Sequence, residues 1–128
     1  MTAPSEAALA FDRFLDDGSP VIADIARALR LTVLAAAPDA VETFDGPDRL
    51  LAFGPGRSRR EFWFAIIPHT AHVNLQLADG ADLPNPDGRI EGTGKRVRHV
   101  KIRSAEDAVA AWLGTIIASQ IALRAERS

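Results

Sequence analysis

The sequence predicts an α+β fold, a two-layer sandwich in which an antiparallel sheet of about four to five strands carries N- and C-terminal helices on one face. Two observations support this fold class. Apolar residues recur at helical spacing near both ends of the chain, whereas in the middle they alternate with a period of two. Glycine and proline separate the alternating segments, which favours hairpin-like strands between terminal helices.

The N-terminal part predicts two helices. The first runs from about Ser5 to Asp16, with Phe11, Phe14 and Leu15 facing inward, and Gly18 ends it. Ser19-Pro20 is typical of an N-cap followed by proline in the first helical position. The second helix has an apolar stripe and ends before Pro38; the stripe consists of Ile22, Ile25, Ala26, Leu29, Val33 and Ala36.

Four segments in the middle predict strands: 49–53, 60–67, 71–77 and 97–103. The third alternates most clearly, with Val73, Leu75 and Leu77 on one side. The segment 78–96, rich in Gly, Pro and Asp, is expected to be a loop. If the last two strands are neighbours, they form an open polar sheet face with His72, Asn74, Gln76, His99 and Lys101. Arg98 lies on the opposite, apolar side of its strand, where we expect it to pair with a buried carboxylate.

The C-terminal part predicts one amphipathic helix. Ser104-x-x-Asp107 resembles a capping box with Asp in place of Glu. An apolar stripe follows, made of Val109, Trp112, Leu113, Ile116, Ile117 and Ile121. The whole chain, 1–128, is expected to be a single domain with a helical extension at 1–18 and a core at 19–128.

The composition narrows the class of protein. The 128 residues include no cysteine, so disulfides, thiol nucleophiles and thiolate metal sites are excluded. The longest apolar run, 31–37, is shorter than the about 20 residues that span a bilayer, and no secretory signal is evident. We therefore expect a cytoplasmic protein that does not bind membranes. Thirteen Arg to two Lys, with many Ala, is typical of a GC-rich bacterial genome.

The segment 85–104 contains Gly92-x-Gly94-Lys95 and a run of basic residues. It does not fit a phosphate-binding loop, because Arg stands where the first Gly is required and a strand follows in place of a helix. A glycine-dependent turn explains the pattern better. The net charge of −2 and the absence of aromatics between the bases favour a solvated, charge-balanced surface over a nucleic-acid-binding one, so no nucleic-acid partner is expected. A small anionic ligand near Lys95 and Arg96 remains compatible with the pattern.

The stretch "HVNLQLADGADLPNPDGRIEGTGKRVRHVKI" at 72–102 resembles the signature of the YdhG-like family, a domain of unknown function. The resemblance covers most of 22–120 and implies a frataxin-like fold, with helices flanking an antiparallel sheet. Some members of the family are described as iron chaperones, so the resemblance implies a role in iron binding or delivery. A tyrosine-bearing strand entrance of the family is missing, since this chain has no tyrosine.

The acidic residues offer a second set of candidates. Asp39, Glu42, Asp45 and Asp48 follow the second helix within ten residues, in a place comparable to the acidic surface of frataxin-like proteins. Their carboxylate oxygens suit ferrous iron. Caps and solubilising charge are the alternative interpretation of such a cluster.

Two non-catalytic functions are therefore expected as alternatives, since no known catalytic constellation is present. An enzyme is a third alternative, which would require an enclosed pocket with perturbed titratable groups. The first is weak iron binding or delivery through the four carboxylates. The second is a module that binds a small anionic ligand or a protein partner through the open sheet face and the Gly92–Arg98 loop. The residues of this second site are Gly92, Gly94, Lys95, Arg96, Arg98, His72 and His99. The chain is expected to be a monomer or, if an exposed aromatic such as Trp63 marks an interface, a homodimer.

Overall fold

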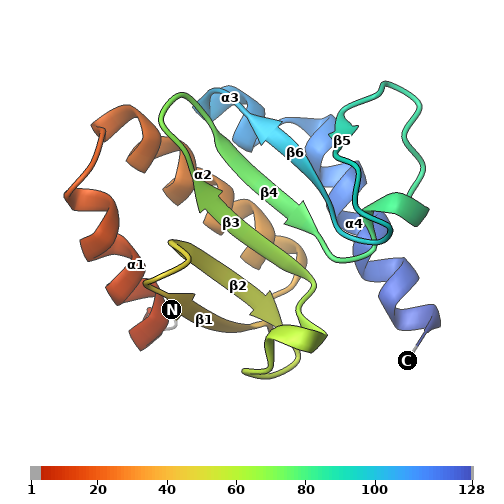
Figure 1. Ribbon diagram of the computed structural model, residues 1–128, viewed down its shortest axis with the longest axis horizontal. Helices are drawn as coiled ribbons and strands as arrows, with labels where there is room; N and C mark the ends of the chain where they lie inside the picture. The colour runs from red at the N-terminus through yellow and green to blue at the C-terminus, as the bar shows by residue number, and fades with distance from the viewer. Residues whose placement is uncertain (1–3, 128) are drawn as a thin grey trace.

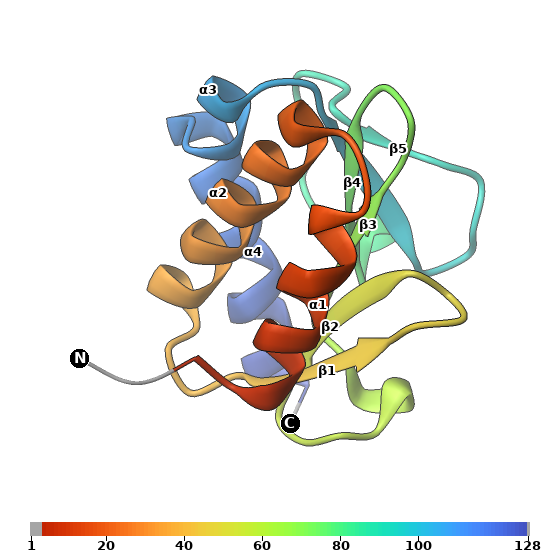
Figure 2. The ribbon, with the colours of Figure 1, turned by 90° about the vertical axis from the view of Figure 1, so that its left-hand side faces the viewer.

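The computed structural model describes residues 4–127 and has the predicted α+β architecture (Figure 1). The helices α1 (Glu6–Asp16), α2 (Pro20–Ala36), α3 (Ala105–Ala108) and α4 (Ala111–Glu126) lie on one face of the sheet, as Figure 2 shows. The six strands are β1 (Val41–Asp45), β2 (Leu50–Gly54), β3 (Phe64–Pro68), β4 (Val73–Leu77), β5 (Ile90–Glu91) and β6 (Arg98–Ile102). The fold class is thus confirmed, with a strand count slightly above the expected four to five.

The sheet is antiparallel throughout, in the order β1-β2-β3-β4-β6-β5. Its register places Leu75 between Ile66 and Val100, and all three side chains point to the helices and are fully or almost fully buried. The opposite face pairs Asn74 with Lys101 and Gln76 with His99. The predicted open face of β4 and β6 is therefore present, because the two strands are neighbours.

Local sequence explains where the helices begin. The Ser5 and Ser19 side chains accept hydrogen bonds from Ala8 N (3.0 Å) and Ile22 N (3.4 Å), and these bonds cap α1 and α2. The cap at Ser19 is the predicted one. Helix α1 is part of the main core, since Phe11 and Leu15 are buried in it. The Phe11 and Phe14 rings also pack against Phe44 of β1, with centroids 5.9 and 5.8 Å away.

Four sequence predictions of secondary structure need correction. Strand β1 was missed because its five residues, VETFD, are half-buried and carry two acids, and β5 was missed because it has only two residues. The strand predicted at 60–67 begins only at Phe64, because a short 3₁₀-helix, η1 (Arg59–Glu61), precedes it. The C-terminal helix is broken after Ala108, which leaves Val109 with 66% of its surface exposed.

One helical stretch of the described chain, Ala105–Glu126, is long and apolar enough to cross a bilayer by length and composition, with a mean hydropathy of 1.4. This is weak evidence, because the core helix of a folded domain passes the same test. Here the break at 109–110 interrupts the stretch, and Leu113, Ile117 and Gln120 are buried in the domain. The compartment of the protein remains a prediction.

Candidate functional site

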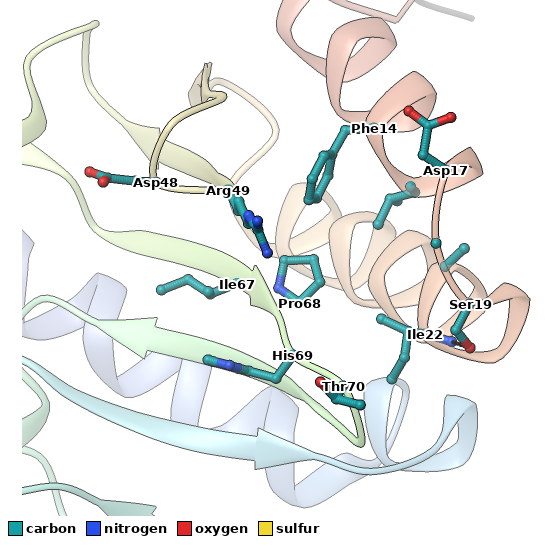
Figure 3. A pocket seen from close by; sticks show the side chains of 13 residues that line it. Phe14, Asp17, Ser19, Ile22, Asp48, Arg49, Ile67, Pro68, His69 and Thr70 are labelled. Carbon is teal, nitrogen blue, oxygen red and sulfur yellow. Dashed lines mark hydrogen bonds between the residues drawn. The ribbon is translucent and has the colours of Figure 1, made fainter.

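A large cavity lies where the turn between α1 and α2 meets the ends of β2 and β3 (Figure 3). Its volume is about 600 Å³, which falls in the range of small-molecule sites. We call it the Arg49 cavity. Its apolar lining comes from both layers of the sandwich: Phe14, Leu15, Ile22, Ala23, Ile67 and Pro68.

Arg49 supplies the cation of this cavity. It is the one non-glycine residue with positive φ, +56°, between residues 4 and 127, at the end of the tight turn that connects β1 to β2. A side chain in this left-handed conformation costs free energy relative to glycine, and such strain is concentrated at functional sites. Figure 3 shows the guanidinium directed toward Pro68 and the side of Phe14. The conformation therefore directs a positive charge toward an apolar lining.

The two acidic residues of the cavity, unlike Arg49, do not direct their charged groups toward the apolar lining. Asp17 and Asp48 line it, yet in Figure 3 the Asp48 carboxylate points away from the Arg49 guanidinium and the Asp17 carboxylate points away from the cavity. Within the described chain, none of the ion pairs includes Arg49. Of the charged side chains that line the cavity, the Arg49 guanidinium is therefore the one directed toward the apolar lining.

A histidine pair adjoins the cavity on the open sheet face. His69, which lines the cavity, stacks on His72 with ring centroids 4.9 Å apart. The Asn74 side-chain amide and His69 Nε2 are joined by a hydrogen bond of 3.1 Å. Burial, with a further contribution from the nearby His69 and Lys101, lowers the pKa of His72.

Asn74 also has an unsatisfied group. Its Oδ1 atom is buried and has no hydrogen-bond partner within the described chain. An unpaired buried acceptor costs about 1–3 kcal/mol, so a donor from water or from a ligand would be stabilising there. Sequence reasoning placed Asn74 on this face but did not single it out.

The structure divides the predicted ligand-binding residues between two ends of the sheet. His72 lies at the end formed by Pro68, Val73 and Ile102, beside the Arg49 cavity. Arg98 and the preceding loop lie at the opposite end, where Arg98 pairs with Leu77. His99 is next to Gln76 and Gly92 rather than to His72. The seven residues therefore do not form one site.

The glycines of the predicted Gly92–Arg98 site have a structural role. Gly92 has φ +117°, and a Cβ on Gly94 would lie 2.5 Å from the Val97 carbonyl oxygen. The segment leads into β6 and not into a helix, which confirms the turn interpretation. Lys95 is exposed in this loop.

The expected pairing of Arg98 with a buried carboxylate is wrong. Arg98 Nε donates to the Gly94 carbonyl oxygen at 2.6 Å, whereas Arg96 binds the buried Asp79 at 3.0 Å. The reason is backbone pairing: Ala81 N donates to Arg96 O, which places Arg96 beside the turn that contains Asp79.

The predicted metal-binding carboxylates do not converge. Glu42 points to the helices, where Arg30 binds both of its oxygens at 2.6 and 2.9 Å. Asp45 Oδ1 accepts from Asp48 N within the β1–β2 turn, and Asp39 is exposed before β1. No three His, Asp or Glu side chains in the described part of the chain are grouped so that they could hold a metal ion. Iron binding stays a prediction that this geometry does not favour.

Comparison with protein-family models, with curated proteins and with solved structures finds no significant match to this chain. Membership of the YdhG-like family, and with it the frataxin-like fold, therefore stays a proposal that rests on the motif at 72–102.

Sequence reasoning missed Arg49 as a site residue. The only local signal is its place after Gly46-Pro47-Asp48, because a tight turn of this length between strands needs a residue in the left-handed region. His69 was seen only as a turn residue after Pro68. What brings both to one cavity is the antiparallel pairing of β2 with β3, which no local pattern fixes.

Proposed function

We propose that the protein is a cytoplasmic binding protein for a small amphipathic anion, such as a medium-chain or aromatic carboxylate, which it holds in the Arg49 cavity without chemical conversion. The observation that carries this proposal is the Arg49 guanidinium, held by a strained backbone beside an apolar lining and outside any ion pair of the described chain. The ligand class is that of the second sequence prediction, but the site is different.

The shape and lining of the cavity support this ligand class. An apolar chain or ring fits between Phe14 and Ile22 on the helix side and Ile67 on the strand side. Its burial contributes about 25 cal/mol for each Å² of apolar surface removed from water. The carboxylate then meets Arg49, whose planar guanidinium binds carboxylates through two parallel hydrogen bonds. Thr70, which also lines the cavity, offers a hydroxyl donor.

Three eight-carbon probes test the proposal: octanoate, octanol and octylammonium, each titrated below its aggregation concentration. Amide NMR signals of Ile22, Arg49, His69 and Thr70 report on the cavity, and calorimetry gives the Kd. We expect saturable binding of octanoate, weaker binding of octanol and the weakest binding of octylammonium. Tighter binding of octylammonium would instead assign the cavity to cations through Asp17 and Asp48 and would overturn the proposal.

Two variants of one residue separate charge from folding. Arg49→Gly removes the guanidinium and relieves the left-handed strain, so its free energy of unfolding should be unchanged or about 1 kcal/mol higher. Its Kd for octanoate should rise at least tenfold. Arg49→Lys keeps the charge and should lose less affinity, while the exposed Arg57→Gln, outside the cavity, is the matched control. Equal octanoate affinity in Arg49→Gly and wild type would contradict the assigned role.

A further inference from the structure

A second set of charged residues surrounds Asp79, at the end of the sheet opposite the Arg49 cavity. The Asp79 side chain is fully buried and accepts hydrogen bonds from four side chains. On Oδ1 these come from Arg96 (3.0 Å) and Arg127 (3.1 Å), and on Oδ2 from Gln120 (2.7 Å) and twice from Arg124 (3.1 and 2.8 Å). One carboxylate thus holds three guanidinium groups together.

This arrangement leaves hydrogen-bond donors of Arg127 available beside the carboxylate. Asp82 is a second acid in the cluster and binds Arg127 at 2.9 Å. Arg127 uses two N–H groups on Asp79 and Asp82, of the about five that a guanidinium carries. Its side chain is 42% exposed, so its other N–H groups can reach a ligand.

A cavity of about 580 Å³ adjoins these arginines. We call it the Trp63 cavity. Arg124 and Arg127 line one part of it, and Glu61 of η1 also contributes to the lining. The apolar lining is formed by Trp63 and Ile121 together with Pro55 and Ala125. Within the described chain Glu61 is exposed and none of the ion pairs includes it.

The charges that line the cavity are of both signs. A simple anion would gain from Arg127 and Arg124 but would be repelled by Glu61, and a simple cation would meet the reverse. A zwitterion with an apolar group satisfies both signs at once and places its apolar part on Trp63.

We propose that the Trp63 cavity is a second ligand site, which takes a free α-amino acid with an apolar side chain. The ligand carboxylate binds Arg127 beside Arg124, its ammonium group binds Glu61, and its side chain packs on Trp63 and Ile121. Asp79 does not touch the ligand; it is a positioning residue, because it fixes the arginines by hydrogen bonds. This site is separate from the Arg49 cavity and does not depend on the function proposed for it.

Four compounds test the assignment: phenylalanine, its amide, N-acetylphenylalanine and phenethyl alcohol. The amide lacks the carboxylate, the acetyl compound lacks the ammonium group, and the alcohol lacks both. The readout is the indole N–H signal of Trp63 in NMR spectra. The second tryptophan, Trp112, is an internal control, because it lies in another cavity under Arg89, whose guanidinium carbon is 3.9 Å from the ring centroid.

We expect phenylalanine to shift the Trp63 signal saturably, with at least tenfold weaker binding of each of the other three compounds. Arg127→Gln should reduce binding of phenylalanine and of N-acetylphenylalanine, but not of the amide. Glu61→Gln should reduce binding of phenylalanine and of the amide, but not of N-acetylphenylalanine. Both residues are exposed, so these variants should fold.

Arg89→Gln, at the Trp112 cavity, and Arg49→Gly should leave phenylalanine binding unchanged. No shift of Trp63, an equal shift of Trp112, or equal binding of phenylalanine and phenethyl alcohol would each overturn the proposal. Loss of octanoate binding in Arg49→Gly with retained phenylalanine binding would show that the two sites are independent.

Discussion

Arg124 donates two hydrogen bonds to one oxygen of Asp79, from Nε at 3.1 Å and from Nη2 at 2.8 Å, and so ties the end of α4 to the turn after β4. Gln120, one helical turn earlier, is fully buried and both accepts a hydrogen bond from Asp79 and donates one to it. Its Oε1 accepts from Asp79 N at 2.8 Å and its Nε2 donates to Asp79 Oδ2 at 2.7 Å. The C-terminal helix is therefore held by polar contacts as well as by its apolar stripe.

Asp79→Asn tests this connection. The substitution keeps the size of the side chain but leaves Arg96, Arg124 and Arg127 without their central negative charge. Removing one partner from a buried ion pair costs about 3–5 kcal/mol, and here about 3 kcal/mol is expected because two of the arginines are partly exposed to water. Urea unfolding at pH 7 measures the change. Asp82→Asn, which loses one exposed contact to Arg127, is the matched control and should cost less than about 1 kcal/mol.

The same carboxylate makes stability depend on pH. Burial opposes the ionisation of Asp79, but hydrogen bonds from Gln120, Arg96 and Arg124 outweigh it and lower the pKa to about 2. Because the folded-state pKa is lower than the unfolded one of about 3.9, the unfolded chain binds more protons between these values. The contribution of Asp79 is therefore complete above about pH 4 and is lost as the pH falls to about 2.

This contribution corresponds to about 2–3 kcal/mol, from about 1.4 kcal/mol for each unit of difference between the unfolded-state and folded-state pKa. The free energy of unfolding of wild type, followed by urea titration between pH 6 and pH 2, should fall more steeply than that of Asp79→Asn. Parallel curves for the two proteins would show that Asp79 is not ionised in the folded state.

Gly80, the next residue, is expected to tolerate no side chain. A Cβ at this position would lie 2.5 Å from Cβ and 3.1 Å from Cα of Arg98, so the turn after β4 packs directly on the start of β6. Gly80→Ala should lower the free energy of unfolding by about 1–3 kcal/mol through overpacking. Gly114→Ala is the matched control in α4, where a Cβ meets nothing within 4 Å, and it should raise stability by about 0.5–1 kcal/mol. A neutral Gly80→Ala in thermal unfolding would mean that β6 can move away.

The helices and the main strands could be predicted from local sequence, because each has its own capping residue or hydrophobic period. Ser5 and Ser19 cap α1 and α2, and the alternation of Val73, Leu75 and Leu77 marks β4. The open polar face also followed, since it needed only the pairing of β4 with β6. Strand β5 gave no signal, because two residues are too few to show a period.

The candidate sites could not be predicted in the same way, because their residues come from distant parts of the chain. Asp79 looked like a loop residue, and its partners Arg124 and Arg127 are more than forty positions away. Gln120 is polar, but it lies at a helical position where an apolar residue would continue the buried stripe of α4. A polar residue at such a buried helical position is a usable signal for a buried network. Nothing in the sequence, however, identifies its partner.

Glu42 is expected to act as a structural residue rather than as an iron ligand. Its carboxylate accepts hydrogen bonds from Arg30 at 2.6 and 2.9 Å and from the Ser5 hydroxyl at 3.1 Å. Its side chain is only 6% exposed. The hydrogen bonds from Arg30 to Glu42 raise the pKa of Arg30. Glu42→Gln should therefore lower the free energy of unfolding by about 1–3 kcal/mol, whereas the exposed Asp39→Asn should change it by less than about 0.5 kcal/mol.

An anaerobic titration with ferrous iron, followed through amide NMR signals, addresses the metal directly. If Glu42 is engaged by Arg30, signals of residues 39–48 should broaden only weakly and without saturation. Asp39→Asn and Glu42→Gln should then leave the broadening as it is in wild type. Saturable loss of these signals that Glu42→Gln abolishes, in a protein still shown to be folded, would restore the carboxylates as an iron site and would require Glu42 to release Arg30.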